Sequence, residues 1–150
     1  MTPARRPGHG THPTASQITA LVQAARRTRR RAYAPYSKFR VGAAALTASG
    51  AVVPGCNVEN ASYGLSMCAE RAAIHRAVAE GHRRLRAVAV VGGRAGVLPC
   101  GACRQVMHEF GVEHVIVAGP SGAPRLFALA ELLGHAFGPA DLRAAGRGRR

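Results

Sequence analysis

Hydrophobic residues recur at helical spacing in the first part of the chain and at strand spacing after it. Between Ser16, which can cap a helix, and about Arg31, apolar residues fall on one helix face. The apolar runs 41–47 and 51–58 have the length of strands, and the sequence Ser-Gly between them is typical of a turn. This part of the sequence therefore predicts a helix followed by a β-hairpin.

Helical and strand patterns alternate along the rest of the chain. The stretch 68–80 is rich in alanine and ends before Gly81, as expected for a helix that packs closely on a sheet. Continuous apolar residues at 85–93 have the length of a buried strand. The other expected elements are a helix at 100–110, strands at 114–118 and 125–129, and a short helix at 130–133. This alternation predicts an α/β fold with a mixed five-stranded sheet and helices on both faces.

Length and composition fit one compact domain. The chain has 150 residues, 47% of them hydrophobic, which is enough for a single core. Residues 1–15 and 143–150 lack hydrophobic periodicity, so we expect disordered tails around a folded domain at 16–142. No apolar run reaches the roughly 18–20 residues of a membrane span, and the N-terminus lacks the apolar stretch of a signal peptide. The sequence predicts a cytoplasmic protein without a membrane partner.

The formal net charge of +14 raises the question of a nucleic-acid partner. Residues 1–32 hold seven arginines and residues 143–150 hold four, and neither stretch contains an acidic residue. Residues 33–142 hold ten basic and seven acidic residues, so the excess is concentrated at the ends. We interpret it as solvated ends in an arginine-rich composition. Nucleic acid is therefore not the favoured partner, although a basic end that binds RNA stays open.

Three of the four cysteines begin predicted helices or lie one turn inside them. Cys68 and Cys100 stand at two helix starts, where free N–H groups stabilise a thiolate, and Cys103 follows three residues later. A Cys-x-x-Cys pair alone fits a redox pair, half of a structural zinc site or two core thiols. Three converging thiolates suit Zn²⁺, and three protein ligands leave the fourth position to water, as in a catalytic site.

Cys56 is the remaining cysteine. As a fourth ligand it would close the site and make the zinc structural. It precedes Asn57 on the predicted strand, so the two side chains should point to opposite faces. We therefore expect Cys56 to stay outside the metal site.

Glu70 indicates that the zinc site is catalytic. In the first turn of its helix, its carboxylate can reach over the open side of a metal bound at Cys68. Zinc lowers the pKa of a bound water to roughly 7, and a nearby carboxylate can collect and return the proton. The alternative is a glutamate that only complements the helix dipole.

Taken together, these motifs resemble those of the zinc-dependent cytidine deaminase family. The similarity runs from about Tyr33 to Leu142 and includes YAPYSKFRVGAA, GCNVENASYG, MCAERAA, LPCGACRQVMHEFG and FGPADL. Cysteine stands at the first ligand position, as in the small three-cysteine branch of the family. The resemblance implies a three-layer α/β/α cytidine-deaminase-like fold. It also implies hydrolytic deamination of cytidine and deoxycytidine in pyrimidine salvage, with one Zn²⁺ per subunit held by the three cysteines.

The resemblance assigns the chemistry to residues beside the ligands. Glu70 takes a proton from water, passes it to ring N3 of cytosine and then protonates the departing ammonia. Three thiolates on one dication would blunt zinc as a Lewis acid. By similarity to the family, Arg71 and Gln105 donate hydrogen bonds that draw charge from the sulfurs.

Substrate binding is expected to depend on the stretch NVEN. Asn57 and Glu59 alternate at a strand end, so both should point the same way, and an amide beside a carboxylate suits sugar hydroxyls. The resemblance places the ribose 3′-hydroxyl there, and the carboxylate would repel a 3′-phosphate, which favours free nucleosides. It also implies that Phe39 stacks on the pyrimidine and that the backbone at Ala69 and Cys100 reads its polar edge.

The resemblance implies a homotetramer with shared active sites, in which Tyr63 and Phe137 act across subunit interfaces. Two other functions stay open. Related deaminases act on nucleoside antibiotics such as blasticidin S, although the full NVENASYG stretch favours cytidine. A zinc-stabilised nucleic-acid-binding module would bind RNA or DNA in a salt-sensitive way and would show no deamination.

Overall fold

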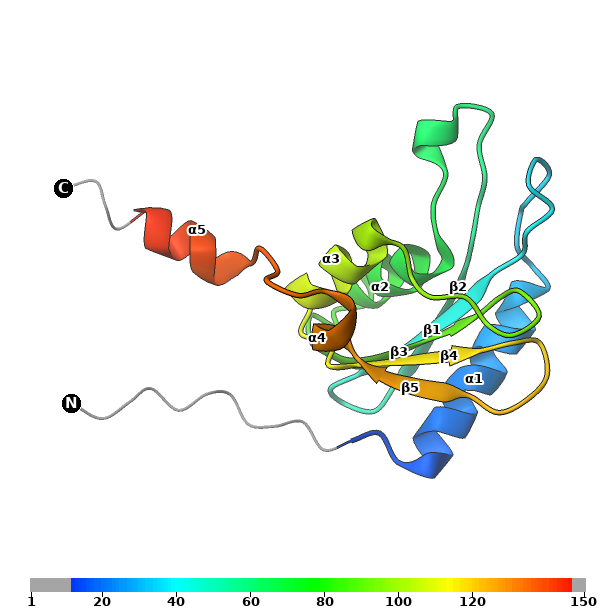
Figure 1. Ribbon diagram of the computed structural model, residues 1–150, viewed down its shortest axis with the longest axis horizontal. Coiled ribbons are helices and arrows are strands. Elements are labelled where there is room, and N and C mark those ends of the chain that lie inside the picture. The colour runs from blue at the N-terminus through cyan, green and yellow to red at the C-terminus, as the bar shows by residue number, and fades with distance from the viewer. Residues whose placement is uncertain (1–11, 147–150) are drawn as a thin grey trace.

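A five-stranded sheet forms the centre of the protein. The computed structural model describes residues 12–146, so the expectations for residues 1–11 and 147–150 lie outside the described residues. The strand order is β2-β1-β3-β4-β5 (Figure 1). The strands are β1 (Gly42–Thr47), β2 (Val52–Cys56), β3 (Leu85–Val91), β4 (His114–Ala118) and β5 (Arg125–Ala128). Only β3 and β4 are parallel, and the other neighbours are antiparallel, which confirms the predicted mixed five-stranded sheet.

Helices cover both faces of this sheet, as predicted. The helix α1 (Ala15–Arg29) buries Leu21 and Ala25 on one face, in a core cluster with apolar residues of β1, β3 and β4. The helices α2 (Ala69–Ala79) and α3 (Gly101–Glu109) pack on the other face in a second cluster. Shorter elements are the 3-10 helix η1 (Tyr63–Leu65), α4 (Leu129–Leu132) and α5 (Pro139–Gly146). The fold therefore has three layers, with the sheet in the middle (Figure 1).

Chain order places the starts of α2 and α3 beside each other. The helix α2 leads into β3, and α3 connects β3 to the parallel strand β4, in which Val115 pairs with Val88. Parallel strands need a crossover of this kind, and a helix is its usual form. Since α2 and α3 lie on the same face and contact each other, residues at their N-termini can form one site.

Two glycines of the hairpin let helices approach the sheet closely. A Cβ at Gly42 would overlap the carbonyl oxygen of Ala25 in α1. A Cβ at Gly55 would overlap the backbone of α2 at Ala69 and Ala73. Neither glycine has a positive φ, so each is needed for space alone. The contact at Gly55 fixes the first turn of α2 against β2.

The start of α1 differs from the prediction. The helix begins at Ala15 because Thr14 and Gln17, and not Ser16, form the cap. Thr14 Oγ1 accepts a hydrogen bond from the Gln17 backbone at 3.2 Å, and Gln17 Oε1 accepts one from the Thr14 backbone at 3.0 Å. This reciprocal arrangement satisfies two N–H groups that the helix cannot pair internally.

Strand and helix ends also differ from the expected ranges. The strand β2 ends at Cys56, and Val58 instead forms isolated bridges with Tyr33 and Met67. At the C-terminal end, α5 continues to Gly146, so residues 143–146 are helical where we expected a disordered tail. No helix among the described residues is both long and apolar enough to cross a bilayer.

Candidate active site

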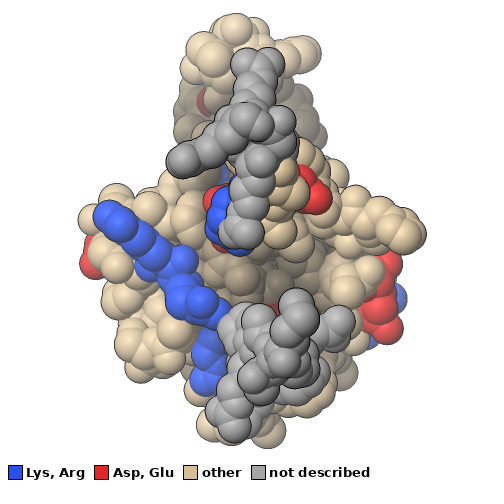
Figure 2. Space-filling model, turned by 90° about the vertical axis from the view of Figure 1, so that its left-hand side faces the viewer, with Lys and Arg blue, Asp and Glu red and all other residues tan. Residues whose placement is uncertain are grey.

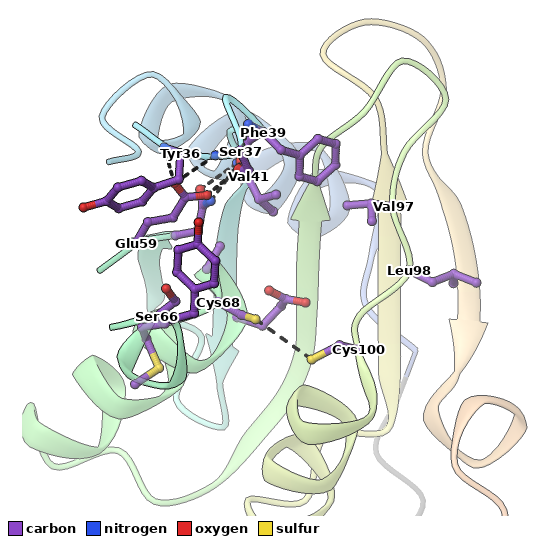
Figure 3. A pocket seen from close by; sticks show the side chains of 15 residues that line it. Tyr36, Ser37, Phe39, Val41, Glu59, Ser66, Cys68, Val97, Leu98 and Cys100 are labelled. Carbon is purple, nitrogen blue, oxygen red and sulfur yellow. Dashed lines mark hydrogen bonds between the residues drawn. The ribbon is translucent and has the colours of Figure 1, made fainter. Parts of the chain in front are cut away.

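Two helix N-termini meet and bring three thiols together. Cys68 is the N-cap of α2 and Cys100 is the N-cap of α3, and neither side chain makes a capping hydrogen bond. Their sulfur atoms lie 3.9 Å apart (Figure 3). Cys103, one turn into α3, is fully buried. Residues three apart share a helix face, so Cys103 adds its sulfur to the same cluster as Cys100.

The three sulfur atoms have the spacing of a tetrahedral zinc site. All three lie within 4.8 Å of one another. With Zn–S bonds of about 2.3 Å, two ligands at a tetrahedral angle stand about 3.8 Å apart. The 3.9 Å between the sulfurs of Cys68 and Cys100 matches this value. Within residues 12–146, Cys56 is not part of the cluster, so the donor set fits Zn²⁺ with three protein ligands.

Hydrogen bonding in the cluster favours a thiolate at Cys68. The bond from Cys103, together with contacts from Arg71 and Cys100, lowers the pKa of the Cys68 thiol to about 5. The hydrogen bond to Cys68, followed by burial, raises the pKa of the Cys103 thiol. Arg71 Nη2 donates to the Cys68 sulfur at 3.7 Å. Metal binding requires deprotonated thiols, so a thiolate already present at Cys68 lowers the free-energy cost of deprotonation at neutral pH.

Glu70 is a buried carboxyl group beside the cluster. It is only 4% exposed and lines the same pocket as Cys68 and Cys100. Burial raises the pKa of Glu70 above its ordinary value, and the charge on Cys68 raises it further. A carboxyl group whose pKa is moved toward neutrality can both accept and return a proton.

The cluster lies in a pocket of about 540 Å³, within the size range of small-molecule sites. Figure 3 shows Phe39 and Val97 at the side of the pocket opposite Cys68 and Cys100. Most of the exposed area of the lining is apolar. The predicted site residues that line it are Phe39, Asn57, Glu59, Tyr63, Cys68, Ala69, Glu70 and Cys100.

Asn57 and Glu59 both line the pocket, and both also hold the loop that precedes β1. Asn57 Oδ1 accepts a hydrogen bond from the Val41 backbone at 2.8 Å, and Nδ2 donates to the Phe39 carbonyl at 2.9 Å. Glu59 accepts from the Tyr36 backbone at 2.9 Å, from the Ser37 backbone at 3.3 Å and from the Ser37 hydroxyl. The hydrogen bond from that hydroxyl is the main reason that the pKa of Glu59 is lowered. The pair therefore shapes the pocket wall.

Other predicted site residues lie outside the pocket lining. Arg71 contacts the cluster by donating a hydrogen bond to the Cys68 sulfur. Gln105 Nε2 donates to the carbonyl of Phe137 at 2.7 Å, a contact that the sequence did not suggest. The Phe137 side chain is 59% exposed and is not among the residues that line the pocket.

Sequence reasoning missed several lining residues. Ser37 could have been suspected, because it lies in the loop that contains Pro35 and Phe39. Its hydrogen-bond partner Glu59, however, is 22 positions away in the sequence. Val97 and Leu98 precede the Cys-x-x-Cys segment and wall the pocket without any local pattern that marks them. Tyr36 and Met67 are likewise placed there only by the folding of loops.

Comparisons with known proteins agree on one family. Residues 15–119 match the model of the cytidine and deoxycytidylate deaminase zinc-binding region. A cytidine deaminase of Sporosarcina psychrophila is 44% identical over 128 residues, covering 83% of this chain and 94% of the relative. One from Mycobacterium tuberculosis is 51% identical over 112 residues, covering 74% and 82%. The crystal structure of cytidine deaminase from Burkholderia pseudomallei matches with a TM-score of 0.75 and 50% identity, covering 79% of this chain and 98% of that one.

Proposed function

Because the chain belongs to the cytidine and deoxycytidylate deaminase family, we propose that its pocket deaminates free cytidine and deoxycytidine. The products are uridine or deoxyuridine and ammonia, and zinc is the cofactor. The observation that carries this proposal is the buried carboxyl of Glu70 in the same pocket as Cys68 and Cys100. A structural zinc site would have no use for an acid at that place.

Three cysteines hold the metal, with sulfur spacing that fits Zn²⁺. When bound, zinc supplies a water whose pKa is lowered to about 7. Three thiolates on one dication leave a net negative charge, which weakens this effect. Arg71 offsets part of that charge through its bond to Cys68.

Glu70 moves the protons of the reaction. Its carboxylate accepts a proton from water and delivers it to N3 of cytosine, which makes C4 a better electrophile. The remaining hydroxide adds at C4, Glu70 transfers the proton of the new C4 hydroxyl to the amino group, and the C4–N bond breaks to release ammonia and leave a C4 carbonyl. The raised pKa of Glu70 suits this exchange, because an acid–base catalyst works best with a pKa near the working pH.

The pocket walls position the nucleoside. Phe39 stacks on the pyrimidine, and the first N–H groups of α2 and the N–H of Cys100 face the polar edge of the base. Helix N-termini support this assignment, since their first N–H groups have no partner within the helix. Asn57 and Glu59 hold the wall near the ribose through their hydrogen bonds to the loop. The donor and acceptor positions that these bonds leave unused bind the ribose 3′-hydroxyl.

The subunits assemble as a homotetramer in which neighbours complete each pocket. Large apolar side chains lie exposed beside the pocket or on the C-terminal segment, which supports an interface between copies. Tyr63 is 75% exposed, Leu65 70% and Phe137 59%. Tyr63 and Phe137 are assigned to these contacts. The free cysteines suit the reducing cytoplasm, and residues 16–142 form the catalytic domain.

A nucleic-acid-binding function receives less support. On the face that Figure 2 shows, described basic side chains form a diagonal band and smaller separate areas, and most of the described surface there is uncharged. A phosphate-binding surface is expected to carry a continuous stripe of basic residues. The pocket, in contrast, has the volume and the mostly apolar lining of a small-molecule site.

One absorbance assay tests the proposed function. Cytidine, deoxycytidine and a short cytosine-containing oligonucleotide are incubated in parallel with the full chain. We expect loss of the cytosine absorbance band for both nucleosides, no change for the oligonucleotide, and loss of activity with a zinc chelator. Salt-sensitive binding of the oligonucleotide without any deamination would instead favour the nucleic-acid-binding module.

A further inference from the structure

Arg104 makes two short hydrogen bonds from one guanidinium group next to the metal cluster. It follows Cys103 in α3 and is half-buried. Its Nε donates to the carbonyl of Pro99 at 2.7 Å, and its Nη1 donates to the carbonyl of Leu132 at 2.7 Å. The same side chain therefore joins the residue before Cys100 to the last residue of α4.

The segment before Cys100 has no regular secondary structure, and burial of Pro99 is the other support next to the ligand. Residues 92–99 form no strand or helix, and Gly93 and Gly96 both have positive φ. Cys100 is exposed, whereas Cys103 is fixed by full burial. The position of the Cys100 sulfur thus depends on what holds the chain just before it.

The other end of the bridge is anchored in the core. The helix α4 has only four residues, and its first, Leu129, is 4% exposed and packs in the core cluster of α2 and α3. The backbone N–H of Leu129 also donates to the carbonyl of Glu113 at 2.8 Å. A planar guanidinium that binds two carbonyls at once couples the position of Pro99 to that of α4 more rigidly than a flexible lysine amine can.

We propose that Arg104 is a positioning residue for the metal site. It ties the Pro99–Cys100 turn to α4, so that the Cys100 sulfur stays where a metal held by Cys68 and Cys103 requires it. The proposal rests on the proposed function, because it takes the three-cysteine cluster to bind zinc. Arg104 contacts no reacting atom and acts only through the ligand that follows Pro99.

Zinc release from the full-length holoenzyme tests this role. The first-order rate of release to an excess of chromogenic chelator is measured for the wild type, Arg104→Ala and Arg104→Lys. We expect Arg104→Ala to release zinc about 10–100-fold faster, the range found when outer partners of metal ligands are lost. Arg104→Lys should fall between the two, because one ammonium can reach a single carbonyl at a time.

Arg76→Ala is the matched control. Arg76 lies on α2, the other helix that carries a ligand, and within residues 12–146 its exposed side chain pairs only with Glu80, at 2.8 Å. This variant should release zinc at the wild-type rate. If Arg104→Ala does not fold, Arg104→Lys alone decides, and a rate equal to the wild type overturns the proposal.

Cobalt substitution supplies a readout that a purely structural role would not move. Thiolate-to-cobalt charge-transfer bands report how many sulfurs bind and how closely. We expect weaker bands in Arg104→Ala and partial recovery in Arg104→Lys. A wild-type spectrum and release rate in Arg104→Ala, even with a lower melting temperature, would overturn the inference. A wild type that binds no zinc would instead refute the proposed function.

Discussion

Asn57 holds Phe39 in place through the backbone: its Nδ2 donates a hydrogen bond to the Phe39 carbonyl at 2.9 Å. Its Oδ1 accepts from the Val41 N–H at 2.8 Å, so one amide fixes both sides of Arg40. The loop that carries the aromatic wall of the pocket is therefore tied to the end of β2. Substrate affinity should depend on this tie as much as on direct contact.

We expect Asn57→Ala to raise the KM for cytidine at least about tenfold, since two hydrogen bonds of about 1 kcal/mol each are lost. The kcat should change less, because the cysteine cluster and Glu70 are untouched. Asn57→Asp is the informative companion. It keeps the acceptor for Val41 but turns a carboxylate oxygen toward the Phe39 carbonyl, so its KM should rise as well. An unchanged KM in both variants would remove the loop from substrate binding.

Glu59 should discriminate against a phosphate on the ribose. Its pKa is lowered, chiefly by the Ser37 hydroxyl, so the carboxylate stays charged throughout the neutral range. We expect Glu59→Gln to raise the ratio of kcat/KM for 3′-CMP to that for cytidine about tenfold, by removing a like charge. The ratio is measured by steady-state kinetics at pH 8, where the phosphate, with a second pKa of about 6, is almost fully ionised for both proteins. A ratio that Glu59→Gln leaves unchanged would contradict the assignment.

Glu70→Gln should keep zinc and lose activity. The amide preserves the shape of the carboxyl group but cannot move protons, so the rate should fall by at least roughly 10²–10⁴-fold. Metal analysis and turnover of the same preparation check both halves of the expectation. Glu80→Gln, an exposed substitution at the C-cap of the same helix, serves as the control with wild-type activity. Normal turnover in Glu70→Gln would exclude Glu70 as the proton carrier.

Cys56→Ala should retain one zinc ion per chain. Cys56 is half-buried on β2 and lies outside the cluster of three sulfurs. Cys103→Ala should lose the metal, because it removes one of the three sulfurs of the cluster. Zinc content after dialysis separates the two variants. An emptied site in Cys56→Ala would mean that four protein ligands close the site.

His114 should make folding stability depend on pH. His114 is the first residue of β4. Its ring contacts the ring of His12 in a tilted arrangement, with the two centroids 4.5 Å apart. Burial lowers the pKa of His114, the neighbouring His12 and Arg86 lower it further, and Glu113 opposes them. As the pH falls below about 6.5, the unfolded chain gains a proton before the folded chain does, so stability decreases. Above that pH the contribution is constant.

We therefore expect His114→Gln to flatten the fall in Tm between pH 8 and pH 5.5 relative to the wild type. A domain of this size moves by about 2–4 °C in Tm for each 1 kcal/mol. Because loss of zinc at low pH affects both proteins, the difference between the two curves is the measured quantity. Parallel curves would show that His114 titrates alike in the folded and unfolded states.

The sequence pattern was sufficient for the five strands and the helices between them, but it predicted neither η1 nor α5. The apolar runs at 85–93 and 114–118 are nearly continuous because helices or loops bury these strands on both faces of the sheet. In the structure both segments are inner strands of the sheet. The cysteine spacing predicted the cluster, because Cys100 and Cys103 lie within one helical turn. Helix ends were less accurate, since the cap of α1 depends on Thr14 and Gln17 and not on periodicity.

Contacts between distant loops could not be predicted in the same way. Gln105 reaches the carbonyl of Phe137, 32 positions along the chain, and Arg104 reaches Leu132, 28 positions along. Hydrophobic periodicity describes residues within a few positions of each other. It carries no information on where a long polar side chain finds a carbonyl once the helices are packed. The roles of Arg104 and Gln105 therefore needed the folded chain.

Gly42 and Gly55 limit how this scaffold can be redesigned. Strand propensity alone would recommend valine at both positions. Either change would thicken the middle layer and push α1 or α2 outward by the width of a methyl group. At Gly55 the displaced helix starts with Cys68 and Glu70, which line the pocket, so the damage would appear as misaligned catalytic groups. Mutagenesis that aims at a more stable protein should therefore keep glycine at both positions.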